Sequence, residues 1–345
     1  MRQKALTKIL ILFITLATSA FADVATISQK WDYATYSNSL DKFRSGNIQS
    51  ENAMSEYSSI IENSIPYATY IPPNDERLFV LLLGYRNDTF HGFLVLNKKT
   101  LKVLDFIAED TNNQIQPRIL SYNGKLLISW NIGGDNLEII TSIYDLKTLK
   151  LLYSKEKKFF RITKYSCLLD GQLFNGRLLN PLTGELISRK GIPLKLMVYD
   201  CQNGFILSSL TKRSNEPMRL SLAQLTKKSI VQKIIDTNEV IYGLNLNEWH
   251  LSPNARYIVR DRYISKNEVN GRDGYVYIFD VQNMSSTKLN ISDVNLQDSG
   301  GSGFTKDSKY YIFRSESTIN FIDLASGSIA KIIDLPFRPN IVAID

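Results

Sequence analysis

The sequence predicts an all-β fold built from repeated four-stranded antiparallel units. Segments in which apolar and polar residues alternate run through most of the 345 residues, as strands with a buried face require. Two kinds of polar turn recur between these segments, and stretches with helical periodicity are scarce. The stretch SIYDLKTLKLLYS, residues 142 to 154, contains one copy of the repeated pattern.

The first kind of turn follows a strand that ends in Asp or Asn, with Thr, Ser or Asn three residues later. An Asp or Asn side chain at the first turn position accepts hydrogen bonds from backbone N–H groups further on, and so helps to reverse the strand. A sixth copy keeps Thr226 but has Ala223 at the Asp or Asn position. The five complete pairs are Asn97 and Thr100, Asp145 and Thr148, Asn180 and Thr183, Asp280 and Asn283, and Asp323 and Ser326.

The second kind of turn links a short strand to a more apolar one, earlier in each unit. These turns contain Asn74, Asn123, Asp170, Asn203, Asn254 and Asp307. Each unit therefore has four strands, a to d, with tight a–b and c–d turns. The c–d turns recur on average about every 45 residues, which is the spacing of four-stranded propeller blades. We expect a β-propeller in which six units are visible over roughly residues 66 to 333. The two ends of the chain are expected to pair, and this pairing either closes a ring of six blades or builds a mixed seventh blade.

The turns also carry a family resemblance. The a–b turn SPNARYIV and the c–d turn FIDLASGSIAKI resemble those of exported bacterial β-propellers of the YVTN and WD-repeat-like type, over about four-fifths of the chain. The Gly-His and Trp-Asp signatures of WD repeats are missing. The resemblance therefore implies the fold only, because such propellers include enzymes, scaffolds and binding proteins.

The chain begins with a predicted signal peptide, residues 1 to 22. An apolar run from Ile9 to Leu16 follows three basic residues, Arg2, Lys4 and Lys8. Further on, Ala20-Phe21-Ala22 forms a small-x-small cleavage site. The run is too short to span a bilayer. We expect a periplasmic or secreted protein without stable membrane insertion after cleavage. Residues 23 to 65 are expected to form a partly helical or irregular segment, and residues 66 to 345 the propeller.

Charge and cysteine content limit the partners and the cross-links. The formal net charge is +7, but Lys and Arg are mixed with Asp and Glu, without the dense basic run that tracks phosphates. We expect no nucleic-acid partner. Cys167 and Cys201 stand at matching places before the a–b turns of consecutive units. A disulfide that joins two blades is predicted, with two reduced buried thiols as the alternative.

A candidate binding surface lies on the loops opposite the tight turns. In a four-stranded blade the b–c and d–a connections share this face, and here the b–c connections vary in length. Loops displayed by a rigid scaffold are where binding residues concentrate. The longest b–c connection, in the fifth unit, predicts a contact surface for a protein or glycan, with a plain solvated loop as the alternative. The candidate residues are Tyr263, Lys266, Arg272 and Asp273, with Asp298, Trp249, His250 and Arg262 near them.

Residues for catalysis or metal binding are few. The two histidines, His91 and His250, have no second ligand at metal spacing, and no Gly-x-Ser-x-Gly elbow occurs. We predict no catalytic residue, metal or cofactor. The leading hypothesis is a non-catalytic exported propeller that binds another envelope or secreted protein, as a scaffold, assembly factor or immunity-type inhibitor. The alternative is a carbohydrate lyase or hydrolase at the channel mouth, using Asp298, Arg262, His250 and Glu248, and a third class is small-ligand binding in the channel.

Overall fold

The structure is a computed structural model. It describes residues 24–36, 42–73, 75–84, 89–108, 117–132, 138–156, 162, 166–169, 172–174, 178–187, 197–202, 204–209, 217–225, 230–240, 249–263, 274–291, 302–315, 317–337 and 339–344. The predicted signal peptide lies outside these residues, so export stays a prediction.

The described residues are almost entirely β-strand and turn, which confirms the predicted all-β class. They form seven antiparallel sheets, six of four strands and one of three. The described helices are α2 (Ile48–Glu51) and α3 (Ser58–Glu62). Neither of these is long and apolar enough to cross a membrane.

Six sheets consist of strands consecutive in the chain, and each predicted a-to-d unit falls on one of them. In the third, an isolated bridge between Leu179 and Leu186 stands in the place of a fourth strand. The strands are β4 (Ser64–Tyr70), β5 (Arg77–Gly84), β6 (Phe90–Asn97), β7 (Val103–Ala108); β8 (Arg118–Tyr122), β9 (Lys125–Ile132), β10 (Glu138–Asp145), β11 (Leu151–Glu156); β12 (Cys167–Leu169), β13 (Gln172–Phe174), β14 (Leu178–Leu179); β15 (Met197–Gln202), β16 (Phe205–Ser209), β17 (Pro217–Leu225), β18 (Ile230–Val240); β19 (Trp249–Leu251), β20 (Tyr257–Tyr263), β21 (Gly274–Asp280), β22 (Ser285–Ile291); β23 (Gly303–Phe304), β24 (Tyr310–Ser315), β25 (Thr318–Asp323) and β26 (Ser328–Asp334).

The remaining sheet combines the two ends of the described chain. Its order is β27 (Pro339–Ile344), β1 (Val24–Ser28), β2 (Asp32–Tyr36) and β3 (Lys42–Asn47). β27 runs antiparallel to β1, with Val24 opposite Ile344 and Ile27 opposite Ile341. The segment expected to be helical or irregular, residues 23 to 65, thus contains three strands besides its two short helices. The sequence pattern did not identify these strands, because the partner of the first one stands at the other end of the chain.

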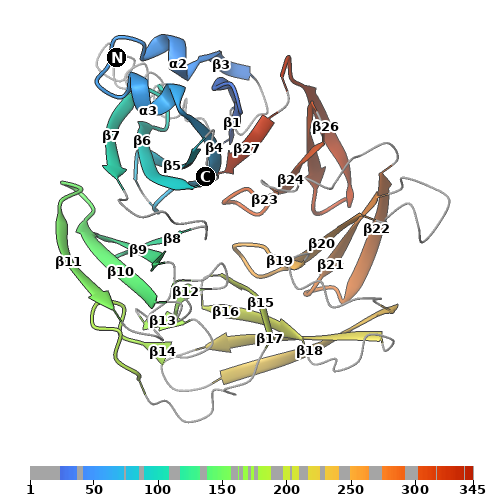
Figure 1. Cartoon of the computed structure of the whole chain (residues 1–345). Helices are drawn as coiled ribbons and strands as arrows, with labels where there is room; N and C mark the ends of the chain where they lie inside the picture. Colours follow the sequence, from blue (N-terminus) through green and yellow to red (C-terminus); the bar gives the residue numbers. More distant parts are fainter. Residues whose placement is uncertain are drawn as a thin grey trace, which may run out of the picture.

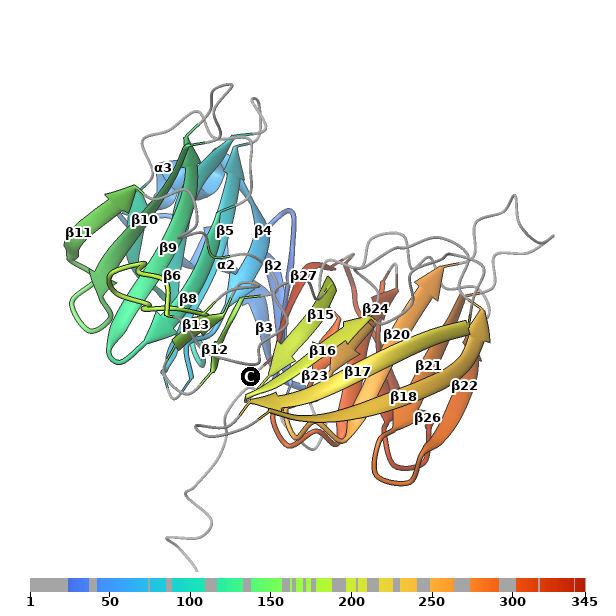
Figure 2. The ribbon, with the colours of Figure 1, turned by 90° about the horizontal axis from the view of Figure 1, so that it is seen from below.

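The sheets follow one another around a common centre. Figure 1 shows the first strands of the sheets, among them β8, β15, β19 and β23, turned toward this centre, and the last strands, such as β11, β18 and β26, turned outward. Figure 2 shows the blue-to-green and the yellow-to-red sheets as two groups, with β2, β3 and β27 between them.

The core lies between neighbouring sheets. Clusters of buried apolar side chains join neighbouring sheets, such as the one that places the rings of Phe93 and Trp130 5.8 Å apart across β6 and β9. A sheet packed on both faces needs apolar residues on both sides of its strands. This explains the continuous apolar run of β5, whose residues from Leu78 to Leu82 are all buried.

The c–d turns have the predicted chemistry. Asn97 Oδ1 accepts hydrogen bonds from the backbone N–H groups of Lys99 and Thr100, at 3.0 and 2.9 Å. The fourth residue after the Asp or Asn has a positive φ in all five turns, as in hairpins that combine a type I turn with a left-handed residue. The corresponding N–H bonds come from Thr148, Thr183, Asn283 and Ser326, and the left-handed residues are Leu101, Leu149, Gly184, Met284 and Gly327.

A polar network fastens the N-terminal segment to the β4–β7 sheet. The buried Tyr33 hydroxyl donates to Glu51 Oε1 at 2.7 Å, and Arg44 Nη2 donates to Glu51 Oε2 at 2.9 Å. Arg44 Nη1 also reaches the carbonyl oxygen of Thr100, in the first c–d turn, at 2.9 Å. Burial, and then the hydrogen bond to the Glu51 carboxylate, raise the pKa of Tyr33 from 10.0 to about 12.

The raised pKa predicts an alkaline loss of stability. A phenol that ionises less readily in the folded state contributes its stabilisation fully below pH 10 and loses it as the pH rises from 10 to about 12. Tyr33→Phe is therefore expected to lose stability less steeply than wild type over this interval in urea unfolding experiments. Tyr67→Phe, at an exposed position, is the control and should follow wild type. Parallel curves for wild type and Tyr33→Phe would contradict this linkage.

The two cysteines belong to the first strands of successive sheets, β12 and β15. Their side chains lie outside the part of the chain that the structure describes. The disulfide between Cys167 and Cys201 stays a prediction.

Candidate functional site

Most of the predicted binding loop lies outside the described residues. This holds for Lys266, Arg272, Asp273 and Asp298, and for the side chains of Arg262 and Tyr263. The described backbone shows how the loop is held, because Tyr263, the last residue of β20, pairs with Gly274, the first residue of β21. The loop thus spans the end of a regular hairpin, and its binding role stays a prediction.

Trp249 and His250 are described, and they belong to two different interfaces. Trp249 is 2% exposed and belongs to the apolar cluster between the β15–β18 and β19–β22 sheets, with its ring 6.3 Å from that of Tyr277. His250 is half-buried, and its ring lies 5.8 Å from that of Tyr311 on β24. Successive residues of a strand point to opposite faces. The two side chains therefore do not converge on one binding site.

A buried arginine accompanies Trp249. Arg260 is 1% exposed; its guanidinium carbon lies 5.4 Å from the Trp249 ring centroid, and its Nη1 donates to Tyr275 Oη at 3.4 Å. Trp249 and Arg260 stand directly opposite each other in the β19–β20 ladder. A buried charge must be compensated by polar or aromatic partners. We assign this pair a structural role between two sheets.

The other histidine, His91, contacts a serine in the way that the base of a catalytic serine–histidine pair does. Ser64 Oγ and His91 Nδ1 are 3.2 Å apart, but Ser64 is buried in β4. A nucleophilic serine needs access to substrate as well as a base, so we assign this contact a structural role too. No three His, Cys, Asp or Glu side chains within the described ranges are grouped as a metal site would require.

The outer strand β11 carries an exposed apolar surface. Its side chains Leu151, Leu152 and Tyr153, which we call the β11 rim, are 55, 45 and 37% exposed. Tyr153 Oη donates to the carbonyl oxygen of Leu182 at 3.1 Å, which ties the rim to the next sheet. β11 is the terminal strand of its sheet, so its outer backbone edge is not part of the β8–β11 ladder.

A β-bulge lies within this rim. Ile143 stands opposite Tyr153 and Tyr144 opposite Leu151, so Leu152 has no partner across the β10–β11 ladder. Bulges re-aim side chains at sheet edges. Our sequence reading did not select these residues, although three consecutive apolar residues in an outer strand break the expected alternation and are a signal for such a surface.

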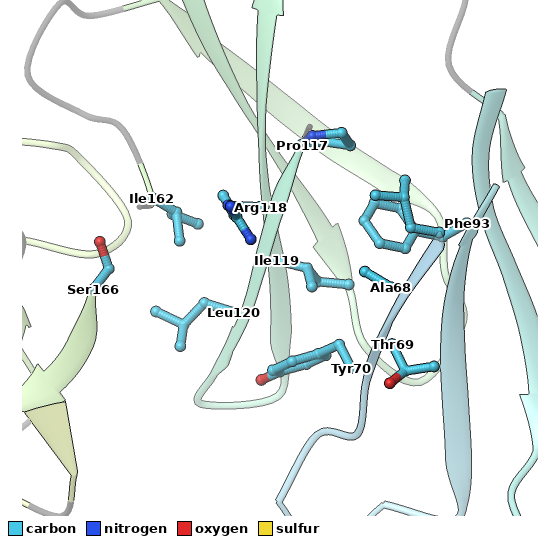
Figure 3. A pocket seen from close by; sticks show the side chains of 11 residues that line it. Ala68, Thr69, Tyr70, Phe93, Pro117, Arg118, Ile119, Leu120, Ile162 and Ser166 are labelled. Carbon is cyan, nitrogen blue, oxygen red and sulfur yellow. The ribbon is translucent and has the colours of Figure 1, made fainter. Parts of the chain in front are cut away.

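A pocket of about 270 Å³ borders β4 and β8, and residues from both faces of β8 line it. Its walls come mainly from β4 and β8, the first strands of these sheets, with further residues from β5, β6 and the segment before β12. Figure 3 shows Arg118 between Ile162 and Ile119, with Tyr70 and Thr69 below them. The lining residues are Ala68, Thr69, Tyr70, Leu81, Phe93, Pro117, Arg118, Ile119, Leu120, Ile162 and Ser166.

The polar groups of the pocket differ in what they offer. The Tyr70 hydroxyl donates to Ser121 Oγ at 2.9 Å and accepts from the Ser121 N–H at 2.7 Å. Because the hydroxyl is engaged in these bonds, the part of Tyr70 that lines the pocket is its aromatic ring. Burial raises the pKa of Tyr70 above its usual value of 10.0. Arg118 is the only charged residue among the described lining residues. The sequence contains no motif for this site, because its residues come from five separate segments.

No protein-family model matches the chain, and no curated protein matches it by sequence. Two solved structures match it across nearly their whole length. A Bacteroides fragilis protein provisionally named 6-phosphogluconolactonase aligns with 12% identity over 95% of this chain and 99% of its own, with a TM-score of 0.55. The apo form of AztD from Citrobacter koseri aligns with 10% identity over 93% and 97%, with a TM-score of 0.50.

A WD40 domain is also among the matching structures. The Pan2 WD40 domain of Neurospora crassa aligns with 11% identity over 85% of this chain and 84% of its own, with a TM-score of 0.46. At such low identity these likenesses concern the fold alone. The predicted fold-level resemblance to WD-repeat-like propellers is confirmed.

Proposed function

We propose that the protein is an exported, non-catalytic β-propeller that binds another protein of the cell envelope. The observation that carries the proposal is the β11 rim. Exposed, contiguous apolar side chains mark protein contact surfaces, since leaving them in water costs free energy. The edge strand beside them also offers backbone groups to which an extended segment can pair. The partner that fits is a protein with an apolar, extended segment.

The proposal includes a closed arrangement of seven blades. The pairing of β27 with β1 supports it, because joining the chain ends in one sheet removes two open edges. A closed ring of sheets packed on both faces is a rigid scaffold, on which both the β11 rim and the predicted loop between β20 and β21 are displayed. Export rests on the predicted signal peptide, and cleavage after Ala22 is testable by the mass of protein recovered from the envelope.

The test is affinity capture followed by quantitative binding. Tagged protein, residues 23 to 345, is incubated with envelope extract, and the enriched protein is identified by mass spectrometry, produced separately and titrated. The double variant Leu151→Ser and Leu152→Ser should weaken binding at least tenfold, because it removes the apolar rim. Val231→Ser with Ile234→Ser on β18 is the matched control, since these are also exposed apolar residues of an outer strand, and it should bind as wild type.

A third arm deletes residues 264 to 273. Loss of binding only in this deletion would move the contact surface to the predicted loop and reject the rim. Equal loss in the rim and control variants would indicate non-specific apolar adsorption. Failure of wild type to enrich any partner would contradict the binding function, and glycan and hydrolase screens would then follow.

A further inference from the structure

We propose that, within the protein-binding function on which this inference rests, the β11 rim takes up an acidic, extended segment of the partner, which adds a strand beside β11. Three features of β11 and of the turn before it carry this assignment. They are an edge that the ladder leaves open, apolar side chains on both faces of the strand, and lysines next to them. Figure 1 shows β11 at the outer end of its sheet.

The backbone of β11 offers one edge for pairing. β11 pairs with β10 on one side and is the last strand of the β8–β11 sheet. In an antiparallel ladder, alternate residues of a strand direct their N–H and C=O groups away from the neighbouring strand. On a terminal strand these groups are open to an extended segment, which can form main-chain hydrogen bonds with them. The edge therefore favours an extended segment over a helix.

The register places the apolar side chains of the rim on both faces of the sheet. Leu151 stands opposite Tyr144, which packs against the cluster shared with the β4–β7 sheet. Tyr153 stands opposite Ile143, which belongs to the cluster shared with the β12–β14 sheet. Opposite residues of a ladder lie on the same face. A strand added beside β11 thus meets apolar groups on each face, so it can cover successive apolar residues of the partner.

Lysines surround these apolar residues. Lys147 and Lys150 are exposed in and after the c–d turn, and Lys155 is half-buried near the end of β11. None of the three forms an ion pair with a carboxylate of the described residues. Opposite charges across an interface favour association, whereas like charges disfavour it. The rim therefore selects an acidic segment over a basic one.

Tyr153 and Lys155 determine where a carboxylate belongs. They are two residues apart on one strand and so lie on the same face, with Lys155 Nζ 5.9 Å from the Tyr153 ring centroid. The bond from Tyr153 Oη to the carbonyl oxygen of Leu182 orients this ring. Residues two apart on the partner strand also share a face. An aromatic or apolar residue beside Tyr153, with an acidic residue two positions away beside Lys155, matches this arrangement.

A short peptide tests the pattern without knowledge of the partner. The probe is acetyl-Thr-Glu-Val-Tyr-Val-Glu-Thr-amide, whose residue order is the same from either end and so suits parallel and antiparallel pairing alike. A basic version has Lys in place of both Glu, and a third version has Pro in place of Tyr, which removes a backbone N–H and opposes strand pairing. Each is titrated into the chain of residues 23 to 345 at about 50 mM salt, where exposed charges are weakly screened.

We expect the acidic peptide to bind with a Kd on the order of 1 mM or tighter. The basic and the proline peptides should bind about fivefold more weakly or worse. In a methyl-labelled sample, the signals of Leu151 and Leu152 should shift on addition of the acidic peptide. Its binding should also weaken when the salt is raised to about 500 mM, because surface ion pairs are then screened.

A charge variant locates the contact. Lys150→Gln with Lys155→Gln should weaken binding of the acidic peptide about fivefold, since each exposed ion pair contributes up to about 1 kcal/mol. Lys288→Gln with Lys309→Gln is the matched control and should bind as wild type. These two lysines also lie near tyrosine rings, 4.1 and 4.8 Å from the centroids of Tyr275 and Tyr310, but in other sheets. Circular dichroism establishes that each variant is folded.

Four results would overturn the inference. They are absence of acidic-peptide binding to wild type, equal binding of the basic peptide, equal binding of the proline peptide, and wild-type affinity in the folded Lys150→Gln, Lys155→Gln variant. Phosphatidylglycerol vesicles are a further probe. If they bind wild type but not this variant, while the acidic peptide does not bind, then the rim contacts a membrane surface and the inference is wrong.

Failure of this inference is distinguishable from failure of the protein-binding function. The partner found by affinity capture is titrated with both the Leu151→Ser, Leu152→Ser variant and the Lys150→Gln, Lys155→Gln variant. Loss of binding in both supports the acidic segment. Loss only in the serine variant upholds the proposed function and rejects the acidic segment.

Discussion

A chain that ends at Phe337, and so lacks β27, is expected to lose most of its stability. β1 is buried along its whole length, and β27 covers one of its edges through pairs from Val24 to Ser28. Each backbone hydrogen bond contributes a net of about 1 kcal/mol. Removal of the ladder and of the apolar contacts of β27 should therefore cost roughly 5 kcal/mol or more, comparable to the whole stability of a typical domain.

Urea unfolding followed by tryptophan fluorescence measures this loss. The three tryptophans Trp31, Trp130 and Trp249 are all buried, and they belong to three different apolar clusters. A chain that ends at Ile344 is the matched control, since it lacks only the residue after β27. If the two truncated chains unfold at the same urea concentration, then β27 does not close the fold and the seven-bladed arrangement is wrong.

The second large effect is expected for Trp249→Ala. This ring fills the interface between two sheets and faces the Arg260 guanidinium. Truncation of a buried tryptophan costs about 3–5 kcal/mol, and here the buried cation also loses its aromatic partner. Trp249→Phe, which keeps a ring at this position, should recover part of the loss. Urea unfolding followed by circular dichroism is the suitable measurement, because the substitution removes a fluorophore.

The adjacent residue supplies the control. His250→Ala, at a half-buried position of the same strand, should cost about 1 kcal/mol or less. Loss of partner binding in a folded, stable Trp249→Phe variant would contradict the structural role and return this residue to the predicted binding surface. Equal destabilisation by Trp249→Ala and His250→Ala would show that the interface does not depend on the tryptophan–arginine pair.

The candidate sites were less predictable than the strands. The sequence drew attention to the loop after Tyr263 through its length and charge, and the structure describes only the hairpin that holds it. The β11 rim had a local signal in the run Leu151-Leu152-Tyr153, but the bulge at Leu152 is visible only in the pairing with β10. The pocket that borders β4 and β8 had no signal at all, because its lining residues come from separate segments of the chain.

The environment of the buried Arg260 was also only partly predictable from the sequence. Arg260 follows Ile258 at the spacing that places both residues on one face of β20, so the alternation implied burial. A charged residue in such a position is normally assigned to the surface. Only the register, which sets Trp249 opposite Arg260, shows how the charge is accommodated.

The sequence by itself determined the all-β class, the succession of four-stranded units and the chemistry of their turns. These features are local: Asn97 or Asp145 bonds backbone groups two or three residues away, and alternation along a strand needs no distant partner. The tertiary structure alone decided that β27 pairs with β1, that Leu152 bulges, and that residues of β4 and β8 line one pocket. The physical reason is that pairing between strands and packing between sheets depend on contacts between residues far apart in the chain, which leave no periodic trace in either partner.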